Sequence, residues 1–104
     1  MITLKKNTDF SRVYRRGTSK ADSYLVLYKL PRDDDGQSRF GISVSKKVGN
    51  SVVRHRIKRR IKEICRLNED GFSTGCDFAV IARVRAAEAD YAALEKSLLR
   101  LMKK

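Results

Sequence analysis

The residues with the clearest capacity for chemistry are cations gathered in one segment, residues 46–66. This segment holds nine basic residues and a single acid, Glu63. Guanidinium and ammonium groups in such number bind phosphates and neutralise their charge. One acid cannot neutralise the segment through internal ion pairs, so the pattern predicts a surface for a polyanion. The basic residues are Lys46, Lys47, Arg54, Arg56, Lys58, Arg59, Arg60, Lys62 and Arg66.

Side chains that could carry out hydrolysis are much scarcer. His55 is the only histidine, and its sequence neighbours are cations rather than a partner that would position it for acid–base catalysis. Together with Cys65 and Cys76 it lacks the number and spacing of ligands that a zinc site needs. No Ser/His/Asp or paired-carboxylate arrangement is apparent, and the acids of residues 33–35 belong to an expected turn. We expect no catalytic and no metal-binding residue in this chain.

A second candidate site lies near the N-terminus. Phe10 and Tyr14 are four residues apart on an expected helix, with Arg15 and Arg16 beside them. An aromatic pair at this spacing usually packs in a core. Exposed rings next to cations would instead stack on unpaired bases and bind the adjoining phosphates. The residues alone leave both interpretations open.

The whole chain has the size and composition of one small basic domain. Its 104 residues carry a net charge of +12, and 41% of them are hydrophobic. A chain of this length buries enough surface to fold without disulfides or metal. The excess positive charge is confined to residues 1–20 and 46–66. We therefore predict a single domain, residues 1–104, that binds nucleic acid or an anionic membrane.

Periodicity along the chain predicts three helices and three strands. Asn7 and Thr8 suit the start of the first helix, and Gly17 suits its end in the left-handed conformation. Lys103 and Lys104 suit the negative end of the last helix dipole. The order α-β-β-α-β-α predicts an α+β fold in which helices cover a sheet. After the first helix we expect strands at 23–30 and 39–45, a helix at 51–67, a strand at 76–84 and a helix at 87–102, with loops at 31–38 and 68–75.

The helix expected over residues 51–67 separates apolar from basic side chains. Val53, Ile57, Ile61 and Ile64 recur at helical spacing and define a core-facing stripe. Arg54 and Arg60 flank this stripe, and the opposite face holds His55, Arg56, Lys58, Arg59, Lys62 and Arg66. A solvated face normally mixes both signs of charge. A helix for membranes or calmodulin would need an apolar side, which here is committed to the core. We therefore favour RNA, bound through its phosphates and its shape.

Three stretches of the sequence strongly resemble the protein component of bacterial ribonuclease P. They are "LKKNTDFSRVYRRGTS", "FGISVSKKVGNSVVRHRIKRRIKEICR" and "DFAVIARVRAAEADYAAL", and the resemblance covers essentially the whole chain. The basic block matches the family motif R-N-R-x-K-R-x-x-R, here Arg54 to Lys62. His55 stands where asparagine is usual, and Lys62 where arginine is usual.

The resemblance implies a fold and a function. Proteins of this family join a large catalytic RNA and remove the 5′ leader of precursor tRNA, and the RNA performs the hydrolysis with bound Mg²⁺. The implied fold is a compact α/β sandwich with a left-handed βαβ crossover through the basic helix, where general rules predict a right-handed one. The resemblance also implies that the protein is a monomer within a complex of one protein and one RNA. Charge alone leaves open a non-enzymatic RNA-binding protein, such as a ribosomal component.

The resemblance also assigns the candidate residues to two RNA partners. The basic helix faces the catalytic RNA, and the first helix and the sheet hold the single-stranded leader. Residues implied for the catalytic RNA are Lys46, Lys47, Arg54, His55, Arg56, Lys58, Arg59 and Lys62. Residues implied for the leader are Phe10, Tyr14, Arg15, Ser43, Ser45, Lys46 and Arg83. Tyr14 replaces the more usual phenylalanine and keeps the flat ring.

The cellular location follows from what the sequence lacks. No apolar stretch follows Met1–Lys6, so we expect no secretory signal, and no apolar run approaches the ~20 residues of a membrane span. Cys65 and Cys76 are too few for a disulfide framework and fit small buried groups. We expect a protein of the reducing cytoplasm.

Overall fold

The computed structural model describes residues 1–33 and 36–103 of the chain. These residues form three α-helices and five strands, and the predicted α+β fold is confirmed. Short 3-10 helices follow β4, α2 and β5: η1 (Lys46–Val48), η2 (Glu69–Gly71) and η3 (Val84–Glu88). The element order is β1 (Ile2–Thr3), α1 (Asn7–Arg16), β2 (Thr18–Ala21), β3 (Leu25–Pro31), β4 (Arg39–Val44), α2 (Ser51–Leu67), β5 (Cys76–Ala82) and α3 (Tyr91–Lys103).

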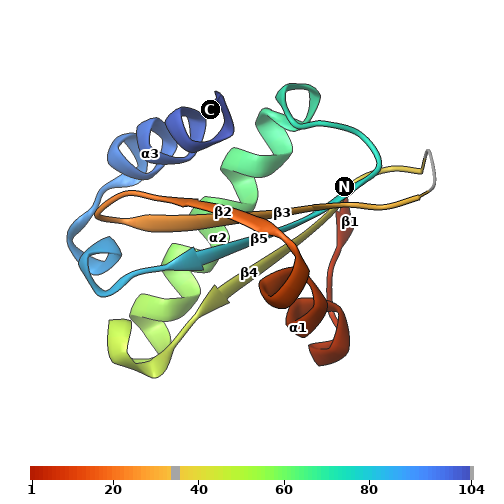
Figure 1. The fold of residues 1–104 in the computed structure, drawn as a ribbon. Coiled ribbons are helices and arrows are strands. Elements are labelled where there is room, and N and C mark those ends of the chain that lie inside the picture. Colours follow the sequence, from red (N-terminus) through yellow and green to blue (C-terminus); the bar gives the residue numbers. More distant parts are fainter. Residues whose placement is uncertain (34–35, 104) are drawn as a thin grey trace.

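The five strands form one mixed sheet in the order β1-β4-β5-β3-β2. β4 and β5 are parallel, with Ser43 opposite Ile81, and β3 runs antiparallel to β5. Helix α1 covers one face of the sheet, and α2 and α3 cover the other (Figure 1). β1 pairs with only Arg39 and Phe40 of β4. The rest of the outer edge of β4 therefore has no partner strand among the described residues.

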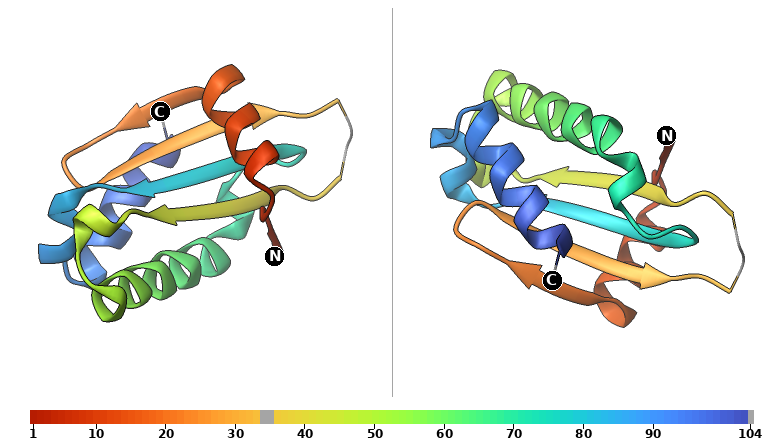
Figure 2. Two further views of the ribbon diagram at one scale, coloured as in Figure 1. Left: turned by 90° about the horizontal axis from the view of Figure 1, so that it is seen from below. Right: turned by 90° about the horizontal axis from the view of Figure 1, so that it is seen from above.

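The connection from β4 through α2 to β5 is left-handed. In the right-hand view of Figure 2, α2 and α3 lie in front of the sheet, and the arrows of β4 and β5 both point left. β5 lies below β4 in that view, which is the left-handed arrangement. Parallel βαβ units are nearly always right-handed. The general rule would therefore have placed β5 on the opposite side of β4, whereas the family resemblance implied the left-handed connection.

Alternation along the strands creates a core on each face. The larger core joins the sheet to α2 and α3, and it includes Phe40, Phe78 and Val80. The predicted stripe of α2 is confirmed, since Ile57, Ile61 and Ile64 are at most 1% exposed. Both cysteines are buried, as expected. The smaller core lies under α1 and consists of Leu4, Val13 and Ala79, with Phe10, Tyr28 and Leu30 partly buried against it.

A buried ion network lies on the α1 face where β4 and β5 begin. The Asp77 carboxylate is 1% exposed and accepts hydrogen bonds from Arg39 Nε at 2.8 Å, Arg39 Nη2 at 2.7 Å and Arg32 Nη1 at 2.8 Å. Burial alone would raise the pKa of Asp77, but these two arginines outweigh it and hold the pKa below its ordinary value. Asp9 of α1 extends the network through Arg39 and Arg12.

Both ends of α1 differ from the predictions. Lys6 precedes the helix, with its carbonyl accepting from the amides of Asp9 and Phe10, so Asn7 lies within the first turn and makes no capping bond. Gly17 is extended, with φ −77°, rather than left-handed, because the chain continues directly into β2. Glycine is still required there, since a Cβ atom would lie 2.6 Å from the Val13 carbonyl oxygen.

Local polar contacts set several other boundaries. The strand predicted from Ser23 begins at Leu25, because Asp22 Oδ1 accepts the amides of Tyr24 and Leu25. β5 ends at Ala82 and η3 follows, so α3 begins at Tyr91 rather than residue 87. Asp90 Oδ1 caps α3 by accepting from the Ala93 amide at 2.8 Å.

The remaining expectations concern the termini, the turn and the membrane. Three residues with an expected role lie outside the described residues: Asp34 and Asp35 of the turn, and Lys104 at the end of the last helix. Lys103 lies in the last turn of α3 and is exposed. No helix in the described part of the chain has the length and apolar content to cross a bilayer.

Candidate nucleic-acid interface

The start of α2 is fixed by its own sequence. Asn50 caps the helix, with Oδ1 accepting from the Val53 amide at 3.0 Å. Gly49 precedes the cap in an extended conformation, and a Cβ atom there would lie 2.9 Å from the side chain of Val53. The cap and the buried isoleucines hold the helix at one rotation, which turns its cations away from the core.

The cations of α2 form an almost uncompensated basic surface. Arg54, Arg56 and Arg60 are half-buried beside the core stripe, and the others are exposed. Across residues 1–33 and 36–103, the one ion pair made by an α2 cation joins Arg66 to Glu63. Charge of one sign repels itself, so the surface favours an anionic partner. The exposed members are His55, Lys58, Arg59, Lys62 and Arg66.

Arg54 and Arg56 are partly removed from water without an internal partner. The Nε atom of each is buried and has no acceptor among the described residues. A desolvated guanidinium attracts an anion more strongly than a fully hydrated one, because less water screens the interaction. These two arginines are therefore the strongest anion-binding candidates on α2.

The segment between β4 and α2 extends the basic surface. Lys46 and Lys47 belong to η1 and are exposed. Just beyond them, Arg54, His55 and Lys58 line a hollow of about 220 Å³ with the last residue of β4 and the first of α2. The residues implied for the catalytic RNA thus come from two consecutive elements, η1 and α2.

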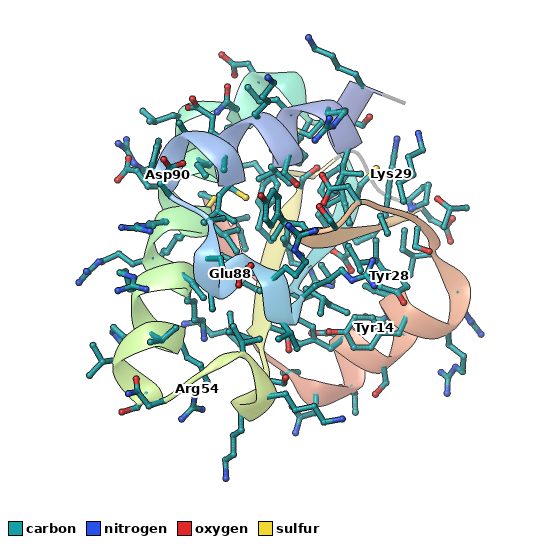
Figure 3. The ribbon with its side chains drawn as sticks, turned by 90° about the vertical axis from the view of Figure 1, so that its left-hand side faces the viewer. Tyr14, Tyr28, Lys29, Arg54, Glu88 and Asp90 are labelled. Atoms are coloured by element: carbon teal, nitrogen blue, oxygen red, sulfur yellow. The ribbon has the colours of Figure 1, made fainter. Side chains whose placement is uncertain are left out.

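The predicted aromatic pair lies between α1 and the sheet. Phe10 is half-buried over β4, whereas Tyr14 is 36% exposed. The two ring centroids are 6.0 Å apart, and the Tyr14 ring lies edge-on to Tyr28 at 5.0 Å. Figure 3 shows Tyr14 and Tyr28 side by side and Arg54 on the α2 side of the molecule. Burial raises the pKa of Tyr14, and a hydrogen bond with Ser43 opposes that shift.

Tyr28 is the residue of this aromatic cluster that the sequence analysis missed. Val26, Tyr28 and Leu30 alternate along β3 with Leu25 and Leu27, so they face α1. That alternation was available in the sequence, but its significance depended on which face α1 covers. The structure therefore provides a three-ring surface, Phe10–Tyr14–Tyr28, in place of the predicted pair.

The other residues implied for the leader lie around these rings. Ser43 is half-buried beneath Tyr14, and Arg15 is exposed on α1. Ser45, Lys46 and Arg83 lie where β4 and β5 end, since Val44 is opposite Ala82 in the register. The side chain of Arg83 donates from Nη1 to the Asp22 carbonyl at 2.8 Å, which directs it toward the β2–β3 turn. Arg83 is therefore held at the β2–β3 turn instead of facing Tyr14 directly.

A hollow of about 430 Å³ connects the α1 surface with the α2 surface across the free edge of β4. Phe10 and Ile42 contribute its apolar wall, and Lys5, Lys58 and Lys62 contribute cations from both sides. Lys5 was not predicted as a site residue, because its role depends on β1 bringing it beside β4. One ammonium group from the segment after β1 and two from α2 therefore border this hollow.

Groups suited to covalent or metal chemistry are sparse. Within the described residues, no three His, Cys, Asp or Glu side chains are grouped closely enough to hold a metal ion. Burial raises the pKa of Cys65 to about 12. His55 is exposed among cations of α2. The features that the two surfaces do offer are phosphate neutralisation and ring stacking.

The chain is similar to a known protein family and to proteins from several bacteria. The family model described as Ribonuclease P matches residues 2–104. The chain belongs to the ribonuclease P protein family. The ribonuclease P protein component of Desulforamulus reducens is 50% identical over 97 residues, which cover 93% of this chain and 85% of that protein. The component of Natranaerobius thermophilus is 46% identical over 104 residues, covering 100% of this chain and 90% of that protein.

Solved structures of ribonuclease P proteins have the same fold. The protein of Staphylococcus aureus superposes with a TM-score of 0.91 at 37% identity, covering 99% of this chain and 94% of that chain. The protein of Thermotoga maritima superposes with a TM-score of 0.88 at 31% identity, covering 99% and 96%. The predicted resemblance to the ribonuclease P protein component is therefore confirmed over nearly the whole chain.

Proposed function

We propose that this protein is the protein subunit of a ribonuclease P ribonucleoprotein that removes the 5′ leader of precursor tRNA. The observation that carries the proposal is the presence of two chemically different surfaces on opposite faces of one sheet. The α2 surface is cationic with almost no internal ion pairs, and the α1 surface has three clustered rings, of which Tyr14 is clearly exposed.

The α2 surface is suited to a folded RNA. Lys46, Lys47 and the cations of α2 neutralise phosphates without needing unpaired bases, and A-form helices offer mainly phosphates and shape. We assign this surface to the catalytic RNA. The RNA would supply the hydrolytic chemistry together with Mg²⁺ that it binds itself, and this chain would contribute no catalytic side chain.

The α1 surface is suited to an unpaired strand. Tyr14 offers a ring for stacking, Ser43 offers a hydroxyl beside it, and Arg15 lies on the same helix. Stacking tolerates different bases, which suits leaders of varied sequence. We assign this surface to the leader. Contacts on both surfaces would hold substrate and catalytic RNA together, which lowers the Mg²⁺ concentration that the reaction needs.

A reconstitution experiment tests the proposal. Purified protein, its cognate catalytic RNA and a precursor tRNA are mixed at low Mg²⁺, in a one-protein, one-RNA ratio. We expect a single cut at the 5′ end of the mature tRNA, dependent on both components, and no cut by the protein alone. Robust cleavage without the catalytic RNA, or no stimulation by the protein, would contradict the proposal. We also propose that the protein acts in the cytoplasm, which its two free cysteines fit.

A further inference from the structure

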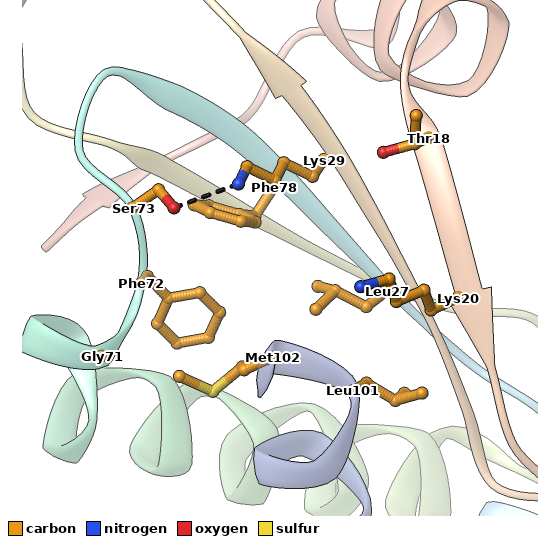
Figure 4. Close-up of a pocket in the computed structure, with 10 residues that line it drawn as sticks. All are labelled: Thr18, Lys20, Leu27, Lys29, Gly71, Phe72, Ser73, Phe78, Leu101 and Met102. Atoms are coloured by element: carbon orange, nitrogen blue, oxygen red, sulfur yellow. Dashed lines mark hydrogen bonds between the residues drawn. The ribbon is translucent and has the colours of Figure 1, made fainter. Parts of the chain in front are cut away.

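A pocket of about 170 Å³ lies on the face of the sheet opposite the rings of α1. Figure 4 shows the residues that line it, which come from β2, β3, β5, the end of η2 with the segment after it, and the end of α3. None of the residues implied for the catalytic RNA or the leader lines it. Its chemistry is therefore separate from that of the two surfaces described above.

The floor of the pocket is apolar and has room for one ring. Leu27, Phe72, Phe78, Leu101 and Met102 provide it, and all except Met102 are at most 6% exposed. A cavity of about 150 Å³ lined by apolar side chains holds benzene. The volume here thus matches a single six-membered ring with small substituents, and it is too small for the tail of a lipid.

The rim of the pocket is cationic and hydroxylated. Lys20 is exposed, and Lys29 Nζ lies 3.0 Å from Ser73 Oγ. Thr18 contributes a second hydroxyl, and no acidic side chain lines the pocket within the described part of the chain. Two ammonium groups above an apolar floor, without a carboxylate, favour a ligand with an apolar ring and an anionic group.

We propose that this pocket binds one pyrimidine nucleotide of single-stranded RNA. The ring would lie on the apolar floor, the phosphate would pair with Lys20 and Lys29, and the hydroxyls of Thr18 and Ser73 would bond the base edge. The choice of RNA over another ring-bearing anion rests on the proposed function. A purine has two fused rings and exceeds the space that one ring occupies.

The two methionines of the chain allow the pocket to be observed directly. Met102 lines the pocket, and Met1 lines the hollow beside β4. In protein with ¹³C-labelled methionine methyl groups, titration with uridine 5′-monophosphate and with hexauridylate should shift the Met102 methyl signal to saturation. Adenosine 5′-monophosphate should bind at least fivefold more weakly. Lys20→Gln combined with Lys29→Gln should weaken uridylate binding at least fivefold, whereas the exposed control Lys96→Gln should not change it.

The outcomes separate this inference from the proposed function. A shift of Met1 alone, an equal Met102 response in the double variant, or equal binding of inorganic phosphate or the adenosine nucleotide would overturn the pocket assignment. The double variant should still assemble with the catalytic RNA and give the 5′ cut. Failure of the wild-type protein in that reconstitution would count against the proposed function, while the Met102 titration would still decide the pocket.

Discussion

The ring of Phe10 on α1 occupies the space above Gly41 on β4 that a side chain would need. A Cβ atom on Gly41 would lie 2.3 Å from Cζ of Phe10 and 2.5 Å from Cε1. Glycine at this position therefore determines how closely α1 approaches the sheet. The approach of α1 in turn sets the depth of the ring surface.

Gly41→Ala should destabilise the fold and disturb the ring surface. Forcing a methyl group into a filled core typically costs about 1–3 kcal/mol. We expect that decrease in the free energy of unfolding, measured by denaturant titration, together with weaker binding of leader-bearing precursor tRNA. Gly71→Ala is the matched control, because its Cβ atom would meet only the flexible end of Met102 at 3.0 Å. An unchanged stability in Gly41→Ala would mean that Phe10 moves aside at little cost.

Tyr14→Ala should weaken the binding of precursor tRNA to the assembled enzyme by about 1–3 kcal/mol, the usual contribution of one stacked base. Binding of mature tRNA and of the catalytic RNA should remain at the wild-type level. Tyr14→Phe is the control, because it keeps the ring and removes only the hydroxyl beside Ser43. Equal losses for precursor and mature tRNA, or a lower melting temperature that accounts for the defect, would assign Tyr14 to packing alone.

Replacing Arg54, Arg56, Lys58 and Arg59 together by alanine should abolish assembly with the catalytic RNA and leave the fold intact. None of the four belongs to the buried isoleucine stripe. For variants with fewer substitutions, each lost phosphate contact should flatten the slope of log K against log salt by about 0.7–0.9. Alanine at Lys96 and Lys103, two exposed cations of α3, should leave both the assembly with the catalytic RNA and the salt slope near their wild-type values. Unchanged assembly and salt slope in the quadruple variant would mean that the RNA binds elsewhere.

Asp77→Asn should destabilise the protein by about 3–5 kcal/mol, because Arg32 and Arg39 would lose a buried counter-ion. The matched control is Glu88→Gln, which removes one carboxylate from an exposed pair with Arg85 at 3.8 Å and should cost less than about 1 kcal/mol. Chemical denaturation of both variants at neutral pH provides the comparison. If Asp77→Asn lowered the free energy of unfolding no more than Glu88→Gln does, the network would contribute little to stability.

The same network predicts how stability depends on pH. The folded pKa of Asp77 lies below its ordinary value of 3.8. The ionised Asp77 carboxylate therefore contributes its full stabilisation of the fold above that pH. This stabilisation is lost as the pH falls through the pKa of Asp77 in the folded protein. The unfolding free energy of the wild type should decrease on acidification in that range, and the decrease should be smaller in Asp77→Asn. Parallel curves for the two proteins would contradict this assignment.

The sequence predicted those elements whose side chains repeat with a clear period. The isoleucines of α2 identified that helix and its core face, because burial selects apolar residues at helical spacing. β2 was missed because all four of its residues are exposed. Backbone hydrogen bonds to β3 hold this strand, and such bonds leave no pattern in the side chains.

The placement of the candidate site residues was predictable to a similar degree. Periodicity indicated that most cations of α2 face away from the core, and the family resemblance assigned the aromatic pair to the leader. The positions of Tyr28 and Lys5 beside the candidate site depend on how α1 and β1 cross the sheet, and the direction of the Arg83 side chain depends on its contact with Asp22. Those crossings arise from contacts between residues far apart in the chain, which no local pattern records.

The central position of β5 has a consequence for the order in which the molecule folds during synthesis. β5 supplies Ala79 to the core under α1 and Phe78 and Val80 to the core under α2 and α3. α1 also packs on β3, and α2 packs mainly on β4. Yet α1 and α2 both precede β5 in the chain, so each emerges from the ribosome before the central strand that completes its core exists. Contacts between such distant segments form slowly, since long loops must close first. Neither the α1 surface nor the α2 surface can reach its final geometry until residue 82 has been added, and a chain truncated before β5 should retain neither of them.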